Sequence, residues 1–377
     1  MGPSDRLDAI LADGVPRVCP AAVALIAVDG AVVAASAAGE LVRYADAPGT
    51  LAGERPPARR DSIFDLASIS KLFTTAVLLS LAEQGGLDVD GPVADWIPGI
   101  DPRLTPRRLL THTAGLVPTR RIDLELPGAD AGERMAAMVR TPVTHPVGGP
   151  YLYSDVGMVV AGRLAELAGG APLDVLVRAR VTEVLGLTET GYRPTGQVTG
   201  QVTGQVTGQV TGQVTGAPRD RERIAATEWK AERPGPGCVR GEVHDETAYA
   251  LGGVAGHAGI FATAGDLLAF GEALRRGGGA VLRAESVAEM TRDQGAGGAP
   301  FRHGLGVRIG DPAIVGPLKD AYGHSGFTGT SLVVDPARGL TVVLLTNAVH
   351  PVRGRDGIRE LRHAVAAEAL RLADLPH

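Results

Sequence analysis

The 377-residue sequence is poor in cysteine and has no long apolar run. Two cysteines, Cys19 and Cys238, cannot build a disulfide framework, so we expect reduced thiols. The longest apolar stretch near the amino terminus, residues 19–28, is far too short to cross a bilayer. The residues before it are rich in Asp and Arg, which is not the pattern of a secretory signal. These absences predict a soluble, cytoplasmic protein with no membrane partner.

Strongly basic runs and metal-binding motifs are missing too. The 37 Lys and Arg against 42 Asp and Glu give a formal net charge of −5, with no sign of a nucleic-acid surface. The nine histidines are scattered and form no His-Glu-x-x-His motif. We therefore interpret His244 and His257 as loop or packing residues and expect no metal. No Gly-x-Gly-x-x-Gly follows a strand, and we expect no other cofactor.

Lysine is the third scarcity, since Lys71, Lys230 and Lys319 are the only three. Lys71 follows Ser68 by three residues, in a stretch whose apolar residues recur at helical spacing. On a helix Lys71 would lie beside the Ser68 hydroxyl, which can also cap the helix. Lysine can activate that serine if burial and the positive helix end lower its pKa. The motif alone leaves a second interpretation open, a capping serine followed by a solvated lysine.

The apolar pattern predicts strands at both ends of the chain and helices between them. Residues 22–28 and 31–36 flank Asp29-Gly30, a strong hairpin signal, and residues 330–334 and 340–346 form a second hairpin. Helical patterns cover residues 4–14, 129–140, 156–168, 173–185, 264–275 and 355–373. We predict an α+β sandwich-type fold: an antiparallel sheet from both termini, flanked by helices, with an inserted helix-rich lobe. The sheet part would comprise residues 1–66 and 300–377, and the lobe residues 67–299.

A repeat interrupts the lobe. Residues 195–214 are five consecutive copies of Thr-Gly-Gln-Val, followed by Thr215-Gly216. A glycine at every fourth position opposes a helix, while strand alternation leaves a β-ribbon open. We interpret residues 195–216 as a flexible surface insertion without a catalytic part.

Three short motifs follow one another along the chain: Ser68-Ile-Ser-Lys71, Tyr153-Ser-Asp155 and His324-Ser-Gly326. Longer stretches at residues 109–116, 241–245, 252–259 and 322–330 accompany them. Together they resemble the serine β-lactamase and penicillin-binding-protein family, most closely its branch of class C β-lactamases and family VIII esterases. The resemblance covers roughly residues 20–372 apart from the repeat. It implies a β-lactamase/transpeptidase-like fold.

The resemblance also implies roles for individual residues. Ser68 would be the acylated nucleophile, Lys71 would help to deprotonate it, and Tyr153 would shuttle protons between Ser68 and the leaving group. A Lys71 ammonium would favour the phenolate form of Tyr153. The backbone N–H groups of Ser68 and Phe327 would form the oxyanion hole.

Two positions depart from the family pattern. Asp155 stands where many β-lactamases have asparagine, and His324 stands where lactamases and peptidases usually have lysine. Asp155 could pair with Lys71, but an ionised carboxylate cannot donate a hydrogen bond. A neutral His324 would be a weak anchor for a substrate carboxylate. Both changes favour esterases and acyltransferases, in which Asp155, His324, Ser325 and Gly326 would bind substrate.

We therefore expect a serine hydrolase that cleaves an ester, thioester or amide of an intracellular small molecule through a Ser68 acyl-enzyme. One alternative is a transacylase that passes the acyl group to an amine or alcohol in natural-product biosynthesis. The sequence does not separate the two, because acceptor choice depends on pocket shape and water exclusion. A non-catalytic ligand sensor of the same fold is a third reading, disfavoured by the intact Ser68, Lys71 and Tyr153. An α/β-hydrolase is disfavoured because residues 323–327 lack the last glycine of its nucleophile elbow.

Overall fold

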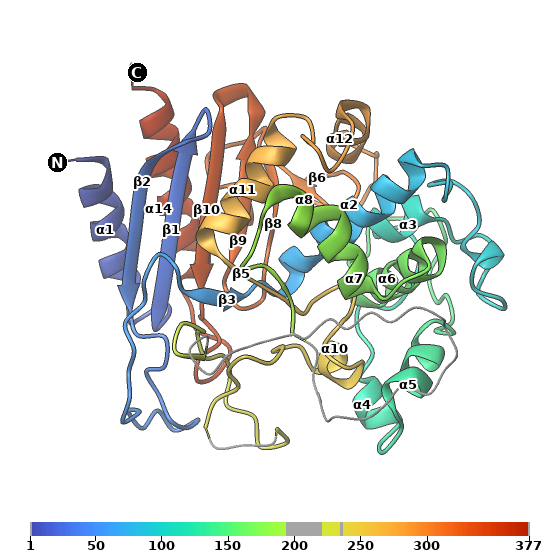
Figure 1. The fold of residues 1–377 in the computed structure, drawn as a ribbon, viewed down its shortest axis with the longest axis horizontal. Coiled ribbons are helices and arrows are strands. Elements are labelled where there is room, and N and C mark those ends of the chain that lie inside the picture. Colours follow the sequence, from blue (N-terminus) through green and yellow to red (C-terminus); the bar gives the residue numbers. More distant parts are fainter. Residues whose placement is uncertain (1, 194–220, 234–236, 376–377) are drawn as a thin grey trace.

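The computed structural model describes residues 2–193, 221–233 and 237–375 (Figure 1). The Thr-Gly-Gln-Val insertion predicted at residues 195–216 lies outside the described residues. Within them, a seven-stranded antiparallel sheet has the strand order β2-β1-β10-β9-β8-β7-β6. The strands are β1 (Ala21–Val28), β2 (Ala31–Gly39), β6 (Arg302–His303), β7 (Arg308–Ile309), β8 (Tyr322–Ser325), β9 (Ser331–Asp335) and β10 (Leu340–Thr346). The predicted sheet from both termini is confirmed.

The first hairpin forms where the sequence predicted it. Asp29 (φ 50°) and Gly30 (φ 86°) both adopt positive φ, which a two-residue turn of this kind requires. β1 then pairs with β10 in antiparallel register from Ala22↔Thr346 to Val28↔Leu340. This pairing joins strands from the two ends of the chain inside the sheet, between β2 and β9.

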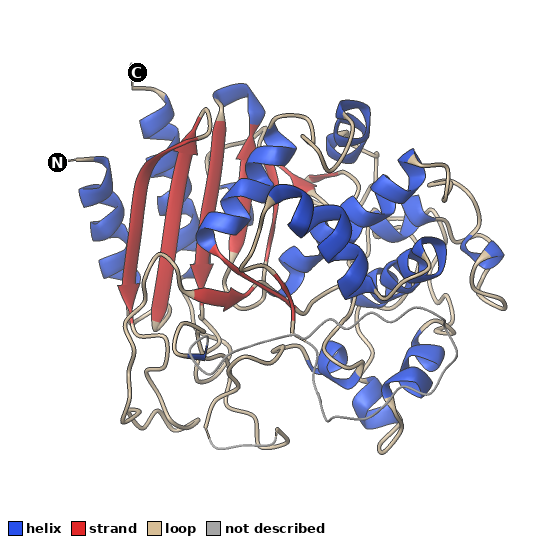
Figure 2. Ribbon diagram, viewed as in Figure 1, coloured by secondary structure: helices blue, strands red, loops and turns tan. Residues whose placement is uncertain are grey.

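Helices cover both faces of the sheet (Figure 2), and alternate residues of β1, β9 and β10 belong to two different cores. Ala22, Ala24 and Ile26 pack with α1 (Pro3–Gly14) and α14 (Ile358–Ala373). Their neighbours Val23 and Leu25 belong to the core on the opposite face, which includes residues of α11 (Ala264–Arg275). The continuous apolar pattern of β1 follows from burial on both faces.

A helix-rich part packs beside the sheet, and a small sheet of order β3-β5-β4 connects the two. That small sheet consists of β3 (Ile63–Asp65), β4 (Gly191–Tyr192) and β5 (Ile260–Thr263). The helices of the helix-rich part are α2 (Ser70–Glu83), α3 (Pro106–Leu110), α4 (Ile122–Glu125), α5 (Ala131–Met138), α6 (Asp155–Gly169), α7 (Leu173–Val177), α8 (Glu183–Leu185), α10 (Glu246–Ala250) and α12 (Ala284–Thr291). The short helix α13 (Pro312–Val315) instead packs against α14, β8 and β9. A π-helical turn, Arg178–Thr182, joins α7 to α8, and short 3-10 turns occur at Ala67–Ile69, Val93–Asp95 and Pro336–Arg338.

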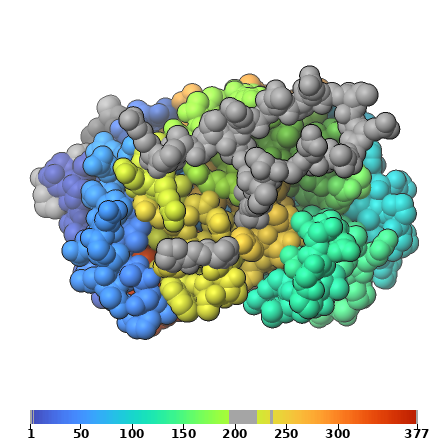
Figure 3. Space-filling view, turned by 60° about the horizontal axis from the view of Figure 1, so that its bottom comes forward, coloured from blue at the N-terminus to red at the C-terminus, as the bar shows by residue number. Residues whose placement is uncertain are grey.

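The arrangement of these helices bears on the site. α11, which the sequence reading placed in the helix-rich lobe, packs on the large sheet against β9 and β10. On the face turned forward in Figure 3, residues 40–60 (blue), the segment that starts at residue 221 (yellow) and α4–α5 (teal) lie side by side.

Among the described helices, none is by itself long and apolar enough to span a membrane. α6 and residues 173–185 meet that test only as a pair bent by 76°. Cys19 and Cys238 are both unbridged, as expected.

Candidate active site

Ser68 lies just before α2 rather than at its capping position. α2 begins at Ser70, and Ser68 lies in the preceding 3-10 turn, so the predicted helix cap is wrong. Its Oγ instead accepts hydrogen bonds from Lys71 Nζ at 2.8 Å and from the Tyr153 hydroxyl at 3.0 Å. Ala67 adopts φ 47°, a left-handed conformation that few residues other than glycine take. In this turn the Ser68 hydroxyl does not cap α2 and instead faces Lys71 and Tyr153, the two side chains that the sequence motifs predicted beside it.

Lys71 is fully buried, and its ammonium lies close to three oxygen atoms. Besides Ser68 Oγ, Nζ lies 2.8 Å from Asp155 Oδ1 and 3.2 Å from the carbonyl oxygen of His257. Burial alone would lower the pKa of Lys71, but the nearby Asp155 carboxylate and Tyr153 raise it above its ordinary value. Lys71 is therefore an ammonium at neutral pH. The lowered pKa that the sequence reading required of a lysine base is not what the structure has.

Two of the groups around Lys71 belong to other elements: Asp155 lies on α6, and the His257 carbonyl lies on a glycine-rich loop. Asp155 is the first residue of α6, and Ser154 caps that helix by accepting the Gly157 N–H at 3.0 Å. The loop of residues 252–259 crosses α6 at Gly256, where a Cβ would lie 2.0 Å from the Met158 carbonyl oxygen. Only glycine permits this approach, which brings the next carbonyl, that of His257, to Lys71. Residues 252–259 contribute to the family resemblance, but the motifs did not predict that this loop provides a hydrogen-bond acceptor for Lys71.

The loop after β8 is tied to the backbone just before Ser68. The Thr328 hydroxyl donates to the Asp65 carbonyl at 2.8 Å, and the Thr330 hydroxyl donates to the Leu66 carbonyl at 3.1 Å. A Cβ at Gly326 would lie 2.1 Å from Thr330 Oγ1, so glycine is needed for this contact. These bonds hold the peptide that follows Gly326 close to the serine turn.

A cavity of about 660 Å³ opens in front of Ser68. Of the predicted site residues, the cavity is lined by Ser68, Tyr153, Asp155, Ser325, Gly326 and Phe327. The Phe327 side chain is 59% exposed at this surface. The cavity therefore brings together the turn before α2, the start of α6 and the end of β8 with the loop after it, which are far apart in the sequence.

Arginines that no motif signalled also line this cavity. Of its described lining residues six are arginines and three are acidic, although the chain carries a net charge of −5: Arg121, Arg308, Arg353, Arg355, Arg359 and Arg362, against Asp155, Asp245 and Glu246. Arg362 is largely buried and donates to the carbonyls of Gly326 at 3.1 Å and Thr330 at 3.0 Å. Burial lowers the pKa of Arg362 to about 10, which leaves it charged at neutral pH. Arginines thus outnumber acidic residues in the described lining, although Arg121, Arg308 and Arg353 form ion pairs with Asp123, Asp311 and Glu228.

His324 occupies a different place from the one expected of a substrate ligand. It is 1% exposed and is not among the described residues that line the cavity. Its Nδ1–H donates to the Ser325 carbonyl at 2.8 Å, its ring lies 6.3 Å from that of Tyr153, and burial lowers its pKa well below the ordinary value. β7 pairs with β8 only at Tyr322 and Gly323, so the end of β8 that carries His324 and Ser325 extends past β7.

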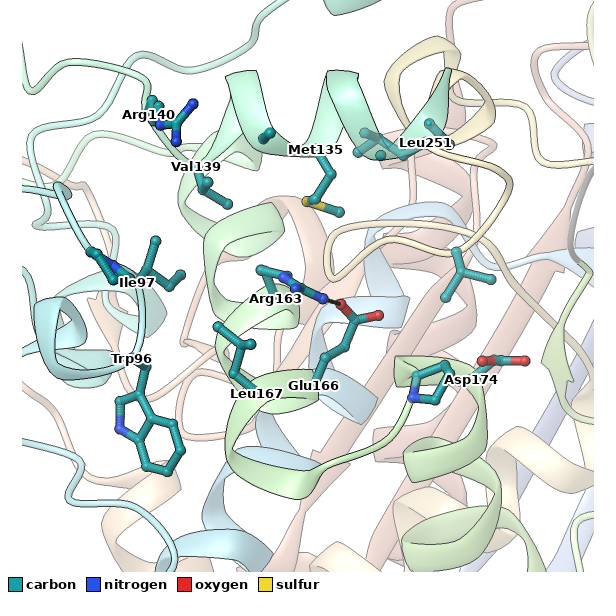
Figure 4. Close-up of a pocket in the computed structure, with 16 residues that line it drawn as sticks. Trp96, Ile97, Met135, Val139, Arg140, Arg163, Glu166, Leu167, Asp174 and Leu251 are labelled. Carbon is teal, nitrogen blue, oxygen red and sulfur yellow. Dashed lines mark hydrogen bonds and ion pairs between the residues drawn. The ribbon is translucent and has the colours of Figure 1, made fainter. Parts of the chain in front are cut away.

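A second hollow, of about 750 Å³, lies between α5, α6 and residues 96–98 (Figure 4). Its wall is mostly apolar, with Trp96, Met135 and Leu167 around the ion pair of Arg163 with Glu166 at 2.9 Å. The described lining contains no serine, threonine, cysteine, tyrosine, lysine or histidine. It therefore lacks a group that could attack a carbonyl.

His244 and His257 form pairs with carboxylates. His257 Nε2 lies 2.8 Å from Asp245 Oδ1, and His244 Nε2 lies 3.0 Å from Glu228 Oε2. In the part of the chain that the structure describes, no three His, Cys, Asp or Glu side chains are grouped to hold a metal ion.

Comparison with known proteins confirms the family resemblance. Residues 7–367 match the family described as Beta-lactamase. A putative D-alanyl-D-alanine carboxypeptidase of Escherichia coli strain K12 is 31% identical over 363 residues, which are 86% of this chain and 78% of that protein. Among solved structures, EstCE1, a hydrolase with promiscuous acyltransferase activity, has a TM-score of 0.69 at 24% identity, covering 96% of this chain and 98% of that one. A mutant of simvastatin synthase from Aspergillus terreus has a TM-score of 0.70 at 20% identity, covering 98% and 95%. Matched over nearly its whole length, the chain belongs to the β-lactamase family, the serine hydrolases of the β-lactamase and penicillin-binding-protein type.

Proposed function

We propose that the protein is a serine hydrolase that cleaves an ester or amide bond of a small molecule through an acyl-enzyme on Ser68. The observation that carries this proposal is the convergence of Lys71 Nζ and the Tyr153 hydroxyl on Ser68 Oγ, at 2.8 and 3.0 Å. These distances are those of direct proton exchange, and the three groups meet beside a cavity large enough for a small substrate.

Before acylation Tyr153 loses its phenolic proton to solvent, so that its hydrogen bond with Ser68 reverses and the Ser68 hydroxyl donates. Ser68 Oγ then attacks the substrate carbonyl carbon while its proton passes to the phenolate oxygen of Tyr153. Lys71 remains an ammonium and stabilises that phenolate, because its raised pKa keeps the positive charge in place. The backbone N–H groups of Ser68 and Phe327 receive the oxyanion. Tyr153 then gives its proton to the departing oxygen or nitrogen as the carbonyl bond to the leaving group breaks.

Deacylation repeats these transfers with water. The Tyr153 phenolate takes a proton from water, whose oxygen attacks the acyl carbon, and the proton then returns to Ser68 Oγ as the ester bond breaks. Lys71 acts in both steps through its charge rather than as the base.

A transacylase is the second candidate. Phe327, whose peptide would bind the oxyanion, is 59% exposed, so the cavity is open to an amine or alcohol as well as to water. The neighbour EstCE1 is described as having promiscuous acyltransferase activity. In this version the acceptor replaces water and Tyr153 deprotonates it.

The test is hydrolysis of p-nitrophenyl esters with and without an added amine, alongside release of D-alanine from an acyl-D-alanyl-D-alanine peptide. Wild type should turn over at least one of these, and Ser68→Ala should lose turnover by about 1,000-fold or more. An amide product that forms only with amine would favour the transacylase. Acylation of Ser68 seen by intact-protein mass spectrometry, without any turnover, would instead identify a ligand sensor. Full turnover by Ser68→Ala would overturn the proposal.

A further inference from the structure

His112, which lies outside the three motifs, contacts the peptides on both sides of Tyr153. Its carbonyl oxygen accepts the Leu152 N–H at 2.8 Å, and its Nδ1 accepts the Ser154 N–H at 3.1 Å. Its ring centroid also lies 4.6 Å from that of Tyr153. One residue therefore supports the backbone before Tyr153, the backbone after it and the ring itself.

The backbone of His112 is adapted to this double contact. It follows α3 and adopts φ 55°, a conformation that is uncommon for residues other than glycine, although histidine takes it more often than most. This turn presents the main-chain carbonyl and the imidazole of the same residue to the segment of residues 152–154. An unfavourable local conformation persists only where surrounding contacts impose it.

The ring must be neutral for this contact. Because Nδ1 accepts an N–H, its own proton sits on Nε2, and an imidazolium would turn a proton toward the Ser154 N–H. His112 is 1% exposed, and burial, reinforced by His303 and Lys71, lowers its pKa well below the ordinary value. The acceptor is therefore maintained across the pH range in which a serine hydrolase works.

Other bonds anchor the neighbouring residues independently. The Ser154 hydroxyl donates to the Val117 carbonyl at 2.7 Å, and the Asp155 N–H donates to the Pro118 carbonyl at 2.8 Å. Removing the imidazole would therefore leave α6 and Asp155 in place and free mainly Tyr153.

We infer that His112 is a positioning residue that holds the Tyr153 hydroxyl in line with Ser68 Oγ. His112 is not itself among the described residues that line the cavity, and it reaches the site through Tyr153. The inference rests on the proposed function in one respect, the role of Tyr153 as the proton carrier.

The experiment compares His112→Ala and His112→Asn with a matched control, His303→Ala. Asparagine tolerates positive φ and places an oxygen near the position of Nδ1, so it should restore the Ser154 contact. His303 is a neighbouring buried imidazole, 5.4 Å from His112 between centroids, whose Nδ1–H donates to the Gly304 carbonyl rather than to the Tyr153 segment. All variants are assayed below their melting temperatures, with circular dichroism confirming the fold.

On a p-nitrophenyl ester, His112→Ala should lower kcat by about 100-fold with KM changed by about twofold or less, because a small misplacement of a reacting group has this effect. His112→Asn should recover to within about fivefold of wild type, and His303→Ala should stay within about threefold. Wild-type kcat in His112→Ala, a folded His112→Asn as slow as the alanine variant, or an equal loss in His303→Ala would each overturn the inference.

A second readout separates this inference from the proposed function. Absence of Ser68-dependent turnover in wild type would refute the function but not the positioning. Crystal structures of wild type and His112→Ala decide the positioning without any substrate: the distance from the Tyr153 hydroxyl to Ser68 Oγ should lengthen beyond about 3.5 Å in the variant. An unchanged distance would refute the role of His112.

Discussion

Mild acid should destabilise the protein through His350. This residue follows β10 and is fully buried, with 0% exposure. Its Nδ1–H donates to the Thr227 carbonyl at 2.9 Å, and its Nε2 accepts the N–H groups of Arg43 and Tyr44, each at 3.0 Å. Only the neutral ring satisfies this set, because a proton on Nε2 would face two donors.

The pKa of His350 gives the size of the effect. Burial lowers it from 6.5 to about 4, despite the hydrogen bond to Thr227, which acts in the opposite direction. The unfolded chain therefore binds the proton more readily than the folded one, so the stability is present above pH 6.5 and is lost as pH falls toward 4. At about 1.4 kcal/mol for each pKa unit, the full loss is about 3 kcal/mol, of which about 2 kcal/mol falls between pH 7 and pH 5.

Urea unfolding at pH 7 and pH 5 measures this loss. His350→Gln cannot titrate, and its amide oxygen can replace Nε2 as the acceptor for the two N–H groups. It should be less stable than wild type at pH 7, yet its further loss between pH 7 and pH 5 should be smaller by about 2 kcal/mol. The exposed His145 provides the control, since His145→Gln should lose as much as wild type. Equal losses in wild type and His350→Gln would refute the assignment of a buried neutral imidazole.

Three further predictions concern the site and the repeat. Replacing Lys71 with Met should lower kcat/KM on a p-nitrophenyl ester by about 1,000-fold, because the charge that stabilises the Tyr153 phenolate is lost. Lys71→Arg keeps the charge and should retain more activity. An Arg variant as inactive as the Met variant would contradict a purely electrostatic role of Lys71. Asp155→Asn breaks the 2.8 Å ion pair, so urea unfolding should show a loss of about 1–3 kcal/mol. The pKa of Lys71 should fall in that variant, which moves the alkaline limit of the kcat profile to lower pH; an unmoved limit counts against the ion pair. Deleting residues 195–216 should change kcat/KM by less than about twofold, and a larger drop would show that the repeat is more than an insertion.

Elements with local signals could be predicted from the sequence. The Asp29-Gly30 turn requires positive φ at both residues, and the apolar spacing over residues 264–275 reproduces the bounds of α11. β7 could not be predicted, because a strand of two residues is too short for an alternating pattern. It is this strand, and β6 beyond it, that move β8 away from the edge of the sheet.

The site could be predicted as a set of residues but not as an electrostatic arrangement. Ser68, Lys71 and Tyr153 have recognisable motifs, and the structure brings their side chains together. The pairing of Asp155 with Lys71 was expected as well, but the raised pKa of Lys71 depends on how this pairing offsets burial, and the neutral state of His324 depends on burial by several elements. Neither effect can be predicted from the spacing of residues that are close in the sequence.

The hydroxyls of Thr328 and Thr330 have a consequence for motion within the molecule. Because they bind the carbonyls of Asp65 and Leu66, the peptide of Phe327 and the turn of Ser68 are fastened to each other directly, rather than through the frameworks that carry them. A small sliding of α2 against the large sheet would therefore carry the two peptides along as one rigid piece. The spacing between the two N–H donors should survive breathing of the surrounding helices, and it is lost only when these two hydroxyl bonds open.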